Sequence, residues 1–169
     1  MATRNTTTGI LSEEKSAERE EIIELLKKAY WMEIETVMSY IANSINPDGV
    51  RAQEIVESLQ QDIQEELGHA QQFAQRIKEL YGVVPGSMDF TPEQSYLQPP
   101  DHQTDIVHVI KGVIEAETGA IEHYNAIIEF CEGRDPVTQD MVIAILRDEE
   151  GHRRLFEGYL REYEMEGLA

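Results

Sequence analysis

The chain of 169 residues contains one cysteine, few aromatic residues and no long hydrophobic run. Its single cysteine, Cys131, cannot form a disulfide within the chain, which agrees with a reducing compartment. No stretch approaches the roughly 18 apolar residues of a membrane helix. Residues Met1–Ser12 are polar and rich in threonine, without the apolar core of a secretory signal. These absences favour a cytoplasmic protein without membrane contact.

Basic residues are also scarce. The chain has 14 Lys and Arg against 33 Asp and Glu, which gives a formal net charge of −19 at pH 7. A field of this sign repels nucleic acid phosphates and attracts cations. Arg4 is the only basic residue in the first 12 positions, so no direct nucleic acid binding is expected. An acidic surface also keeps a protein soluble without binding any metal, so charge alone does not define the function.

Apolar residues recur at spacings of three and four in most of the chain, which predicts an all-α protein with one hydrophobic core. The first helix is expected from Ser16 to the turn Asn46–Gly49, and Gly82 is expected to end the second. Residues 1–12 are predicted to form a flexible tail. Residues 13–169 are predicted to form a single four-helix bundle domain.

The third helix is predicted from about His102 to Glu132, followed by a stop at Gly133. Asp135 and Pro136 are the cap and first-turn proline of a fourth helix. Between Gly82 and Asp101 the chain is too rich in proline and glycine for a helix. About 20 extended residues span ~66 Å, whereas a helix of ~30 residues is ~45 Å long. The connection is therefore predicted to cross over along the bundle, which makes the second and third helices parallel.

Two helices carry the same short motif, Glu-x-Gly-His, at Glu66–His69 and Glu149–His152. A Glu and a His three residues apart project from one helical face and can bind one metal ion. Chance alone predicts roughly 0.7 Glu-x-x-His pairs in a chain of this composition, so the motif by itself is weak.

An internal repeat strengthens the motif. Glu33 precedes Tyr40 by seven residues, and Glu117 precedes Tyr124 by seven, with 84 positions between the two pairs. The two Glu-x-Gly-His motifs are 83 positions apart. Two helix pairs therefore carry one pattern of a carboxylate followed by a carboxylate and an imidazole.

Six polar residues lie within the apolar stripes of the four helices. Four buried carboxylates repel each other unless protons or cations neutralise them, and two divalent metals would do so. Carboxylates and imidazoles without thiolates favour iron or manganese over structural zinc. The nearby Glu35 and Glu115 are predicted to point away from the stripes. The predicted metal and catalytic residues are Glu33, Glu66, His69, Glu117, Glu149 and His152.

The remaining residues of interest have simpler interpretations. Tyr40 and Tyr124 either bond to ligand carboxylates or transfer an electron, although an inward tyrosine is more often a core residue. Trp31 and Met38 are predicted to serve packing or subunit contact. Histidines without a glutamate three residues earlier are expected at the surface: His102, His108 and His123.

The pattern resembles the ferritin-like di-iron carboxylate superfamily over about residues 20–163, and within it bacterioferritins and Dps-like ferritins. The segment MVIAILRDEEGH, from Met141 to His152, is similar to the fourth-helix signature of bacterioferritins. EAETGAIEHY, from Glu115 to Tyr124, looks like the third helix of Dps-like ferritins. The resemblance implies two iron ions per subunit. It also implies that Glu66 and Glu149 bridge them, that Glu33 and Glu117 are terminal ligands, and that His69 and His152 bind one iron each.

The chain departs from these families at two positions. Leu67 replaces the methionine that ligates haem in bacterioferritin, so haem is not expected. Gly119 lies where thioferritins have a central cysteine, so their thiol chemistry is not expected. All six ligands lie in one chain, unlike in ordinary Dps proteins, and no match exists to the extra third-helix glutamate or the rubredoxin domain of rubrerythrins.

The leading hypothesis is a ferroxidase that oxidises Fe(II) with O2 or H2O2 and stores or detoxifies iron as a ferric mineral in a hollow homo-oligomer. Because little sequence remains for a fifth helix, 12 subunits are favoured over 24. The alternative is a rubrerythrin-like peroxidase with di-iron or di-manganese and no storage. A third hypothesis is a helical bundle that binds partners or DNA and has vestigial ligands.

Overall fold

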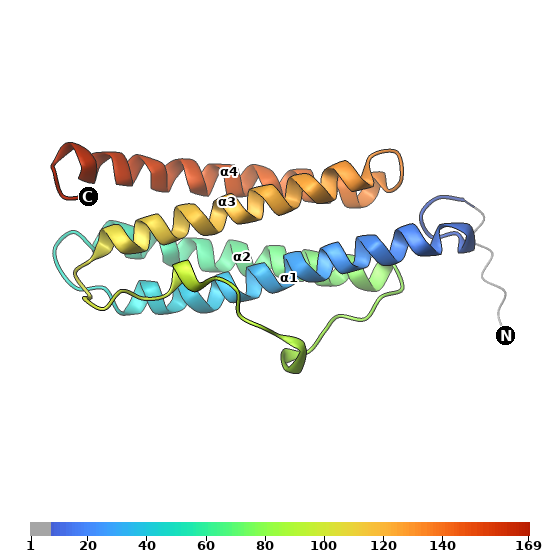
Figure 1. The fold of residues 1–169 in the computed structure, drawn as a ribbon, viewed down its shortest axis with the longest axis horizontal. Coiled ribbons are helices and arrows are strands. Elements are labelled where there is room, and N and C mark those ends of the chain that lie inside the picture. Colours follow the sequence, from blue (N-terminus) through green and yellow to red (C-terminus); the bar gives the residue numbers. More distant parts are fainter. Residues whose placement is uncertain (1–7) are drawn as a thin grey trace.

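The computed structural model describes residues 8–169 and forms a bundle of four long helices (Figure 1). These helices are α1 (Ser16–Ile45), α2 (Gln53–Glu79), α3 (Ile106–Cys131) and α4 (Pro136–Met165). Three single-turn 3-10 helices accompany them: η1 (Glu13–Lys15), η2 (Ser87–Asp89) and η3 (Ser95–Leu97). The described residues contain no strand, so the all-α prediction is confirmed.

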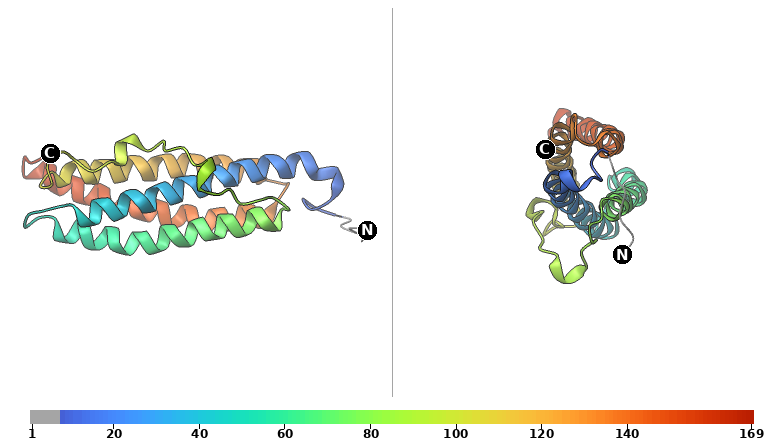
Figure 2. Two further views of the ribbon diagram at one scale, coloured as in Figure 1. Left: turned by 90° about the horizontal axis from the view of Figure 1, so that it is seen from below. Right: turned by 90° about the vertical axis from the view of Figure 1, so that its right-hand side faces the viewer.

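The order and direction of the helices also agree with the prediction. Short turns join α1 to α2 and α3 to α4, and each pair is antiparallel (Figure 1). The long connection between α2 and α3 returns along the bundle, so these two helices run in the same direction (Figure 2). None of the described helices is long and apolar enough to cross a membrane.

The crossover is held over α1 and α3 by buried polar contacts. Both carboxylate oxygens of Glu35 on α1 accept the backbone N–H of Glu93, at 2.9 and 3.0 Å, and Oε1 also accepts the N–H of Gln94 at 2.8 Å. On α3, Gly112 has no room for a side chain, because a Cβ would lie 2.7 Å from the carbonyl oxygen of Tyr96. Glu35 does point away from the bundle centre, but it is buried because the loop amides above it need an acceptor.

Two helix ends differ from the prediction. The third helix begins at Ile106 rather than at His102, because Asp105 caps it by accepting the N–H of His108 at 3.1 Å. At the end of α2, Tyr81 adopts the left-handed conformation with φ 67°, while Gly82 donates its N–H to the carbonyl of Ile77 at 2.9 Å. The left-handed residue after α2 is therefore Tyr81, one position before the glycine that was expected to end the helix.

The turn between α3 and α4 has the predicted form. Gly133 has φ 69°, which glycine adopts without strain. The carboxylate of Asp135 accepts the N–H groups of Val137 and Thr138 at 3.2 and 3.1 Å, and Pro136 is the first residue of α4.

The N-terminal stretch is partly packed. Ile10 is buried in the hydrophobic core, and the guanidinium of Arg19 donates to the carbonyls of Ile10 and Ser12 at 3.0 and 2.9 Å. Residues 8–12 of the predicted tail are therefore joined to α1 by an apolar side chain and by two hydrogen bonds. Residues 1–7 lie outside the described part of the chain.

The hydrophobic core forms two clusters along the bundle axis. The first cluster joins the first half of α1 to the ends of α2 and α3 and includes Leu26, Phe73 and Ile127. The second lies at the opposite end and includes Leu59 and Ile110. Ile41 of α1 lies outside both clusters and is 48% exposed. Between the two clusters lies a polar centre.

Candidate metal centre

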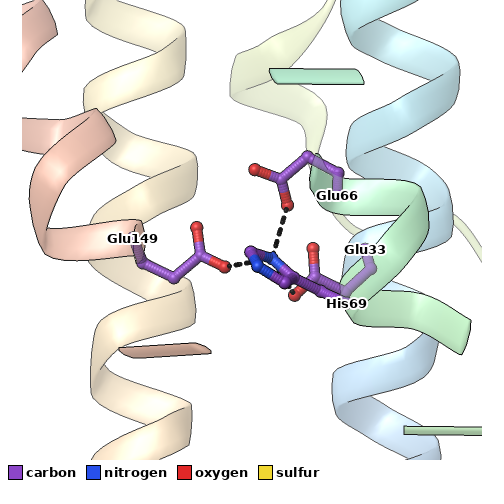
Figure 3. A group of neighbouring side chains, drawn as sticks. All are labelled: Glu33, Glu66, His69 and Glu149. Carbon is purple, nitrogen blue, oxygen red and sulfur yellow. Dashed lines mark ion pairs between the residues drawn. The ribbon is translucent and has the colours of Figure 1, made fainter. Parts of the chain in front are cut away.

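All six residues predicted as ligands meet at this polar centre, and all are buried. Each helix contributes at mid-length, so the centre is shielded by the hydrophobic clusters on both sides. Two overlapping groups of four have their ligand atoms within 4.8 Å of one another. The first group is Glu33, Glu66, His69 and Glu149 (Figure 3), and the second is Glu66, Glu117, Glu149 and His152.

The two groups are related by the internal repeat. Exchanging the α1–α2 pair with the α3–α4 pair exchanges Glu33 with Glu117 and Glu66 with Glu149. Only Glu66 and Glu149 belong to both groups. Because each Glu and His lie three residues apart on one helix, both side chains project from one face and reach the centre together. The geometry thus has two neighbouring positions for a cation, with two shared carboxylates.

Both imidazoles point the same ring nitrogen into the centre. Nδ1 of His69 lies 3.0 Å from Oε1 of Glu149, and Nδ1 of His152 lies 3.3 Å from Oε1 of Glu66. The opposite nitrogens face outward, where Nε2 of His69 lies 3.3 Å from Asp148 and that of His152 lies 3.0 Å from Glu65. A carboxylate that accepts Nε2–H leaves Nδ1 with a lone pair, as metal-binding histidines require.

The two tyrosines bond to carboxylates of the opposite half. The hydroxyl of Tyr40 on α1 donates to Oε1 of Glu117 on α3 at 2.6 Å. The hydroxyl of Tyr124 on α3 donates to Oε1 of Glu33 on α1. Both tyrosines are fully buried. Of the interpretations left open by the sequence, the structure therefore shows the bond to the carboxylates, and each bond ties α1 to α3.

Although Nδ1 of His69 lies 3.0 Å from Oε1 of Glu149, several donor and acceptor atoms of the centre make no well-directed hydrogen bond among the described residues. They are Nδ1 of both histidines, Oε1 of Glu66 and both carboxylate oxygens of Glu149. A buried polar atom without a partner typically costs ~1–3 kcal/mol. Five such atoms at one point fit a site that binds cations, since oxygen and imidazole nitrogen are ligands of divalent metals.

Burial and mutual repulsion control the carboxyl groups. Burial and the charges of Glu66 and Glu149 raise the pKa of Glu33 well above its ordinary value, and the same causes raise the pKa of Glu117. Burial alone would also raise the pKa of Glu66, but its close neighbours Glu33, His152 and His69 outweigh it and lower this pKa. The carboxyls of Glu33 and Glu117 thus favour the protonated form, whereas the carboxyl of Glu66, which both groups share, favours the ionised form.

The imidazoles favour their charged form. Burial lowers the pKa of His69, but the neighbouring carboxylates of Glu149 and Glu66 outweigh it and raise the pKa to about 10. The same opposition raises the pKa of His152 to about 12. In the cation-free protein, protons therefore partly neutralise the buried carboxylates, and divalent cations would replace those protons.

Sequence reasoning missed three carboxylates around the centre. Glu65 and Asp148, the outward partners of the histidines, are related by the same 83-residue shift and could have been found by extending the repeat one position. Asp62 is 4% exposed, and its Oδ1 lies 3.8 Å from Nε2 of His152. Burial raises the pKa of Asp62 to about 6. The matching position in the other half is Ile145, so the repeat contains no signal for Asp62.

Of the three remaining histidines, His102 and His108 are exposed as predicted. His123 is half-buried instead, and its Nε2 lies 2.9 Å from the carbonyl oxygen of Leu25. The prediction for His123 was wrong because it considered only the absence of a neighbouring glutamate. Trp31 packs on Phe90 of the crossover, with 5.2 Å between ring centroids. Met38 is 48% exposed, as a packing or contact residue at the surface can be.

Four helices that present two Glu-x-x-His pairs and two further glutamates to one buried centre match the class of bundle proteins in which such side chains can hold a pair of metal ions. The family model described as a ferritin-like domain matches residues 23–165. The chain therefore belongs to the ferritin family, within the ferritin-like superfamily that the sequence resembled.

Individual relatives agree with this assignment. The chain is 31% identical over 155 residues to a DNA protection during starvation protein of Pyrococcus furiosus, covering 89% of this chain and 82% of that protein. It is 26% identical over 137 residues to a bacterioferritin of Desulfovibrio desulfuricans, covering 80% and 72%. A dodecameric thioferritin from Bacteroides fragilis has the same fold, with a TM-score of 0.77, 24% identity and coverage of 92% of this chain and 97% of that one.

Proposed function

We propose that this protein is a ferroxidase that binds two Fe(II) ions per subunit at the centre and oxidises them with O2 or H2O2. The observation that carries the proposal is the set of six buried candidate ligands from one chain, five of whose donor or acceptor atoms make no well-directed hydrogen bond among the described residues. Because the chain belongs to the ferritin family, iron is the preferred metal. Manganese has similar ligand preferences and is the metal to compare.

The ligands divide into two Fe(II) positions. Glu33 and His69 would hold one ion and Glu117 and His152 the other, with Glu66 and Glu149 shared. Shared carboxylates keep two cations close enough to give one electron each to a single oxidant molecule. Transfer of two electrons and two protons converts O2 to H2O2, or one H2O2 to two waters, and leaves two Fe(III).

The surrounding residues prepare the centre for this exchange. The hydroxyls of Tyr40 and Tyr124 orient Glu117 and Glu33, so the terminal carboxylates are positioned before a cation arrives. Hydrophobic clusters on both sides exclude water and strengthen the attraction between carboxylates and cations. The net charge of −19 adds a field that attracts Fe(II).

The second part of the proposal is storage of the ferric product in a hollow homo-oligomer of 12 subunits. The similarity to a dodecameric thioferritin and to a starvation-protection protein supports this assembly. The rival is a peroxide-consuming protein with the same centre and no storage. Size-exclusion chromatography with light scattering separates the two, because a small dimer cannot hold a mineral.

The oxidation itself is tested by titrating the metal-free assembly with Fe(II) without oxygen and then adding O2 or H2O2. We expect two Fe(II) per subunit and oxidation faster than in buffer, monitored by absorbance of the ferric product. Glu57→Gln on the exposed face of α2 is a matched control that removes one carboxylate far from the core and should behave as wild type. A stoichiometry well below two, or oxidation at the rate of buffer, would contradict the proposal.

A further inference from the structure

One buried carboxylate breaks the twofold relation of the centre. Asp62 on α2 lies one helical turn before Glu66, on the side of the Leu59 cluster, and is 4% exposed. Its Oδ2 atom has no hydrogen-bond partner among the described residues. The matching position in the other half is Ile145, which is buried in the hydrophobic core. Asp62 is therefore a buried acid without a counterpart.

The two imidazoles consequently have unequal surroundings. Behind His69 lies one carboxylate, Asp148, whose side chain is 51% exposed. Behind His152 lie Glu65, with a side chain 41% exposed, and Asp62, with a side chain 6% exposed. Solvent and salt screen exposed charges much more than buried ones. Among the described residues, the buried carboxylate that acts at close range with little screening thus lies beside His152 and not beside His69.

We propose that Asp62 makes the cation position beside His152 the tighter of the two, and so determines which position a divalent cation occupies first. This inference rests on the proposed function, since it assumes that the six ligands bind two cations. Asp62 is a positioning residue, because its Oδ1 lies 3.8 Å from the outer nitrogen of His152 and it belongs to neither group of ligand atoms. The negative charge of Asp62 favours the tautomer of His152 with the proton on Nε2. It also makes Nδ1 a stronger ligand for the cation.

Two single-position backgrounds test the proposal. Glu33→Gln leaves the position beside His152 with its full set of ligands, and Glu117→Gln leaves the position beside His69. Asp62→Asn is added to each, and the metal-free variants are titrated with Co(II) by calorimetry and visible absorption. We expect Asp62→Asn to weaken Co(II) binding about 10- to 100-fold in the Glu33→Gln background, and less than about 3-fold in the Glu117→Gln background.

Asp148→Asn is the matched control, since it removes the carboxylate behind the other histidine. It should weaken Co(II) binding in the Glu117→Gln background only, and by a smaller factor because Asp148 is half exposed. Circular dichroism verifies the fold of each variant. Asp62→Ile, which introduces the residue type of the matching position, provides the same comparison if the amide disturbs packing.

The possible results distinguish the role of Asp62 from the proposed binding of two cations. Equal weakening in both backgrounds, or none in either, would overturn the role of Asp62 and leave the metal centre intact. Failure of both backgrounds to bind Co(II) while Asp62 is present would overturn the proposed function and this inference together.

Discussion

Two of the buried polar clusters in the bundle have opposite characters. At the end of α2, Arg76 donates from Nη2 to both oxygens of Asp135 at 2.9 and 3.0 Å, and from Nε to the hydroxyl of Thr138 at 2.9 Å. The same Asp135 caps α4, and none of these side chains contains a buried atom without a partner. At the candidate metal centre acidic groups outnumber the two imidazoles, and five atoms make no well-directed hydrogen bond among the described residues. In the first cluster every charge and hydrogen bond is matched by another protein group. In the second, the unmatched atoms are suited to bind cations.

This difference distinguishes a structural cluster from a functional one. A bidentate Arg and Asp pair with all hydrogen bonds made joins α2 to the turn between α3 and α4. Four carboxylates held together against repulsion destabilise the folded state unless they are neutralised. We therefore expect substitutions to separate the two clusters: one set should affect stability and the other cation binding.

The largest effect on stability is expected from Arg76→Met. The substitution leaves Asp135 buried without its cationic partner, and breaking such a pair typically costs ~3–5 kcal/mol. Urea denaturation of the metal-free protein measures the loss in the free energy of unfolding. Under native conditions the variant should still bind two cations per subunit. A loss below about 1 kcal/mol would show that the cluster is not the structural element described.

The double variant Glu33→Gln with Glu117→Gln should show the reverse. Amides keep the bonds from the tyrosine hydroxyls but remove two charges, so cation affinity should fall by at least about 100-fold. Because the folded protein raises the pKa of both carboxyls, neutral side chains should stabilise the metal-free protein by about 1–3 kcal/mol at pH 7. Calorimetry and urea denaturation measure the two changes. A less stable variant would contradict the conclusion that the buried carboxyls of Glu33 and Glu117 destabilise the metal-free protein.

The pH dependence of binding should be steep. With pKa values raised to about 10 and about 12, His69 and His152 carry protons at pH 6–8 that must leave before Nδ1 binds a cation. Each released proton raises the apparent affinity about tenfold per pH unit. Calorimetry in two buffers of different ionisation enthalpy counts the protons. Affinity that is constant from pH 6 to 8 would contradict this assignment.

The same shifts affect stability without cations. A histidine whose pKa is raised on folding contributes stability that is complete below its unfolded value of 6.5. That stability is lost as the pH rises through the folded value. The metal-free protein should therefore become less stable from about pH 7 to pH 10, and a divalent cation should remove most of this decline.

The smallest effect is expected from Tyr40→Phe and Tyr124→Phe. Each removes one buried hydrogen bond to a terminal carboxylate, which typically contributes ~0.5–1.5 kcal/mol. The stoichiometry of two cations should remain, with a loss of a few fold in affinity. Equal effects of the two variants would agree with the twofold relation of the halves. A loss of oxidation with unchanged cation binding would instead assign the tyrosines to electron transfer.

Much of this protein is determined by local patterns in its sequence. The period of 3.6 residues identifies the helices and places Glu33, Glu66 and His152 on inward faces, because helical geometry depends only on neighbouring residues. The spacing of turn residues and the length of the crossover identify the bundle topology. The meeting of all six predicted side chains follows from these patterns, since equal positions along four packed helices lie at one level.

Only the tertiary structure decided which groups surround the six side chains at the centre of the bundle. The burial of Glu35 beneath the crossover, the contact of His123 with α1 and the unscreened charge of Asp62 depend on atoms from elements far apart in the chain. Helical periodicity states which face a side chain occupies, but not which backbone amide, carbonyl or ring lies opposite. Only the packing of the helices shows these contacts. The same packing gives the two chemically similar halves of the centre different surroundings.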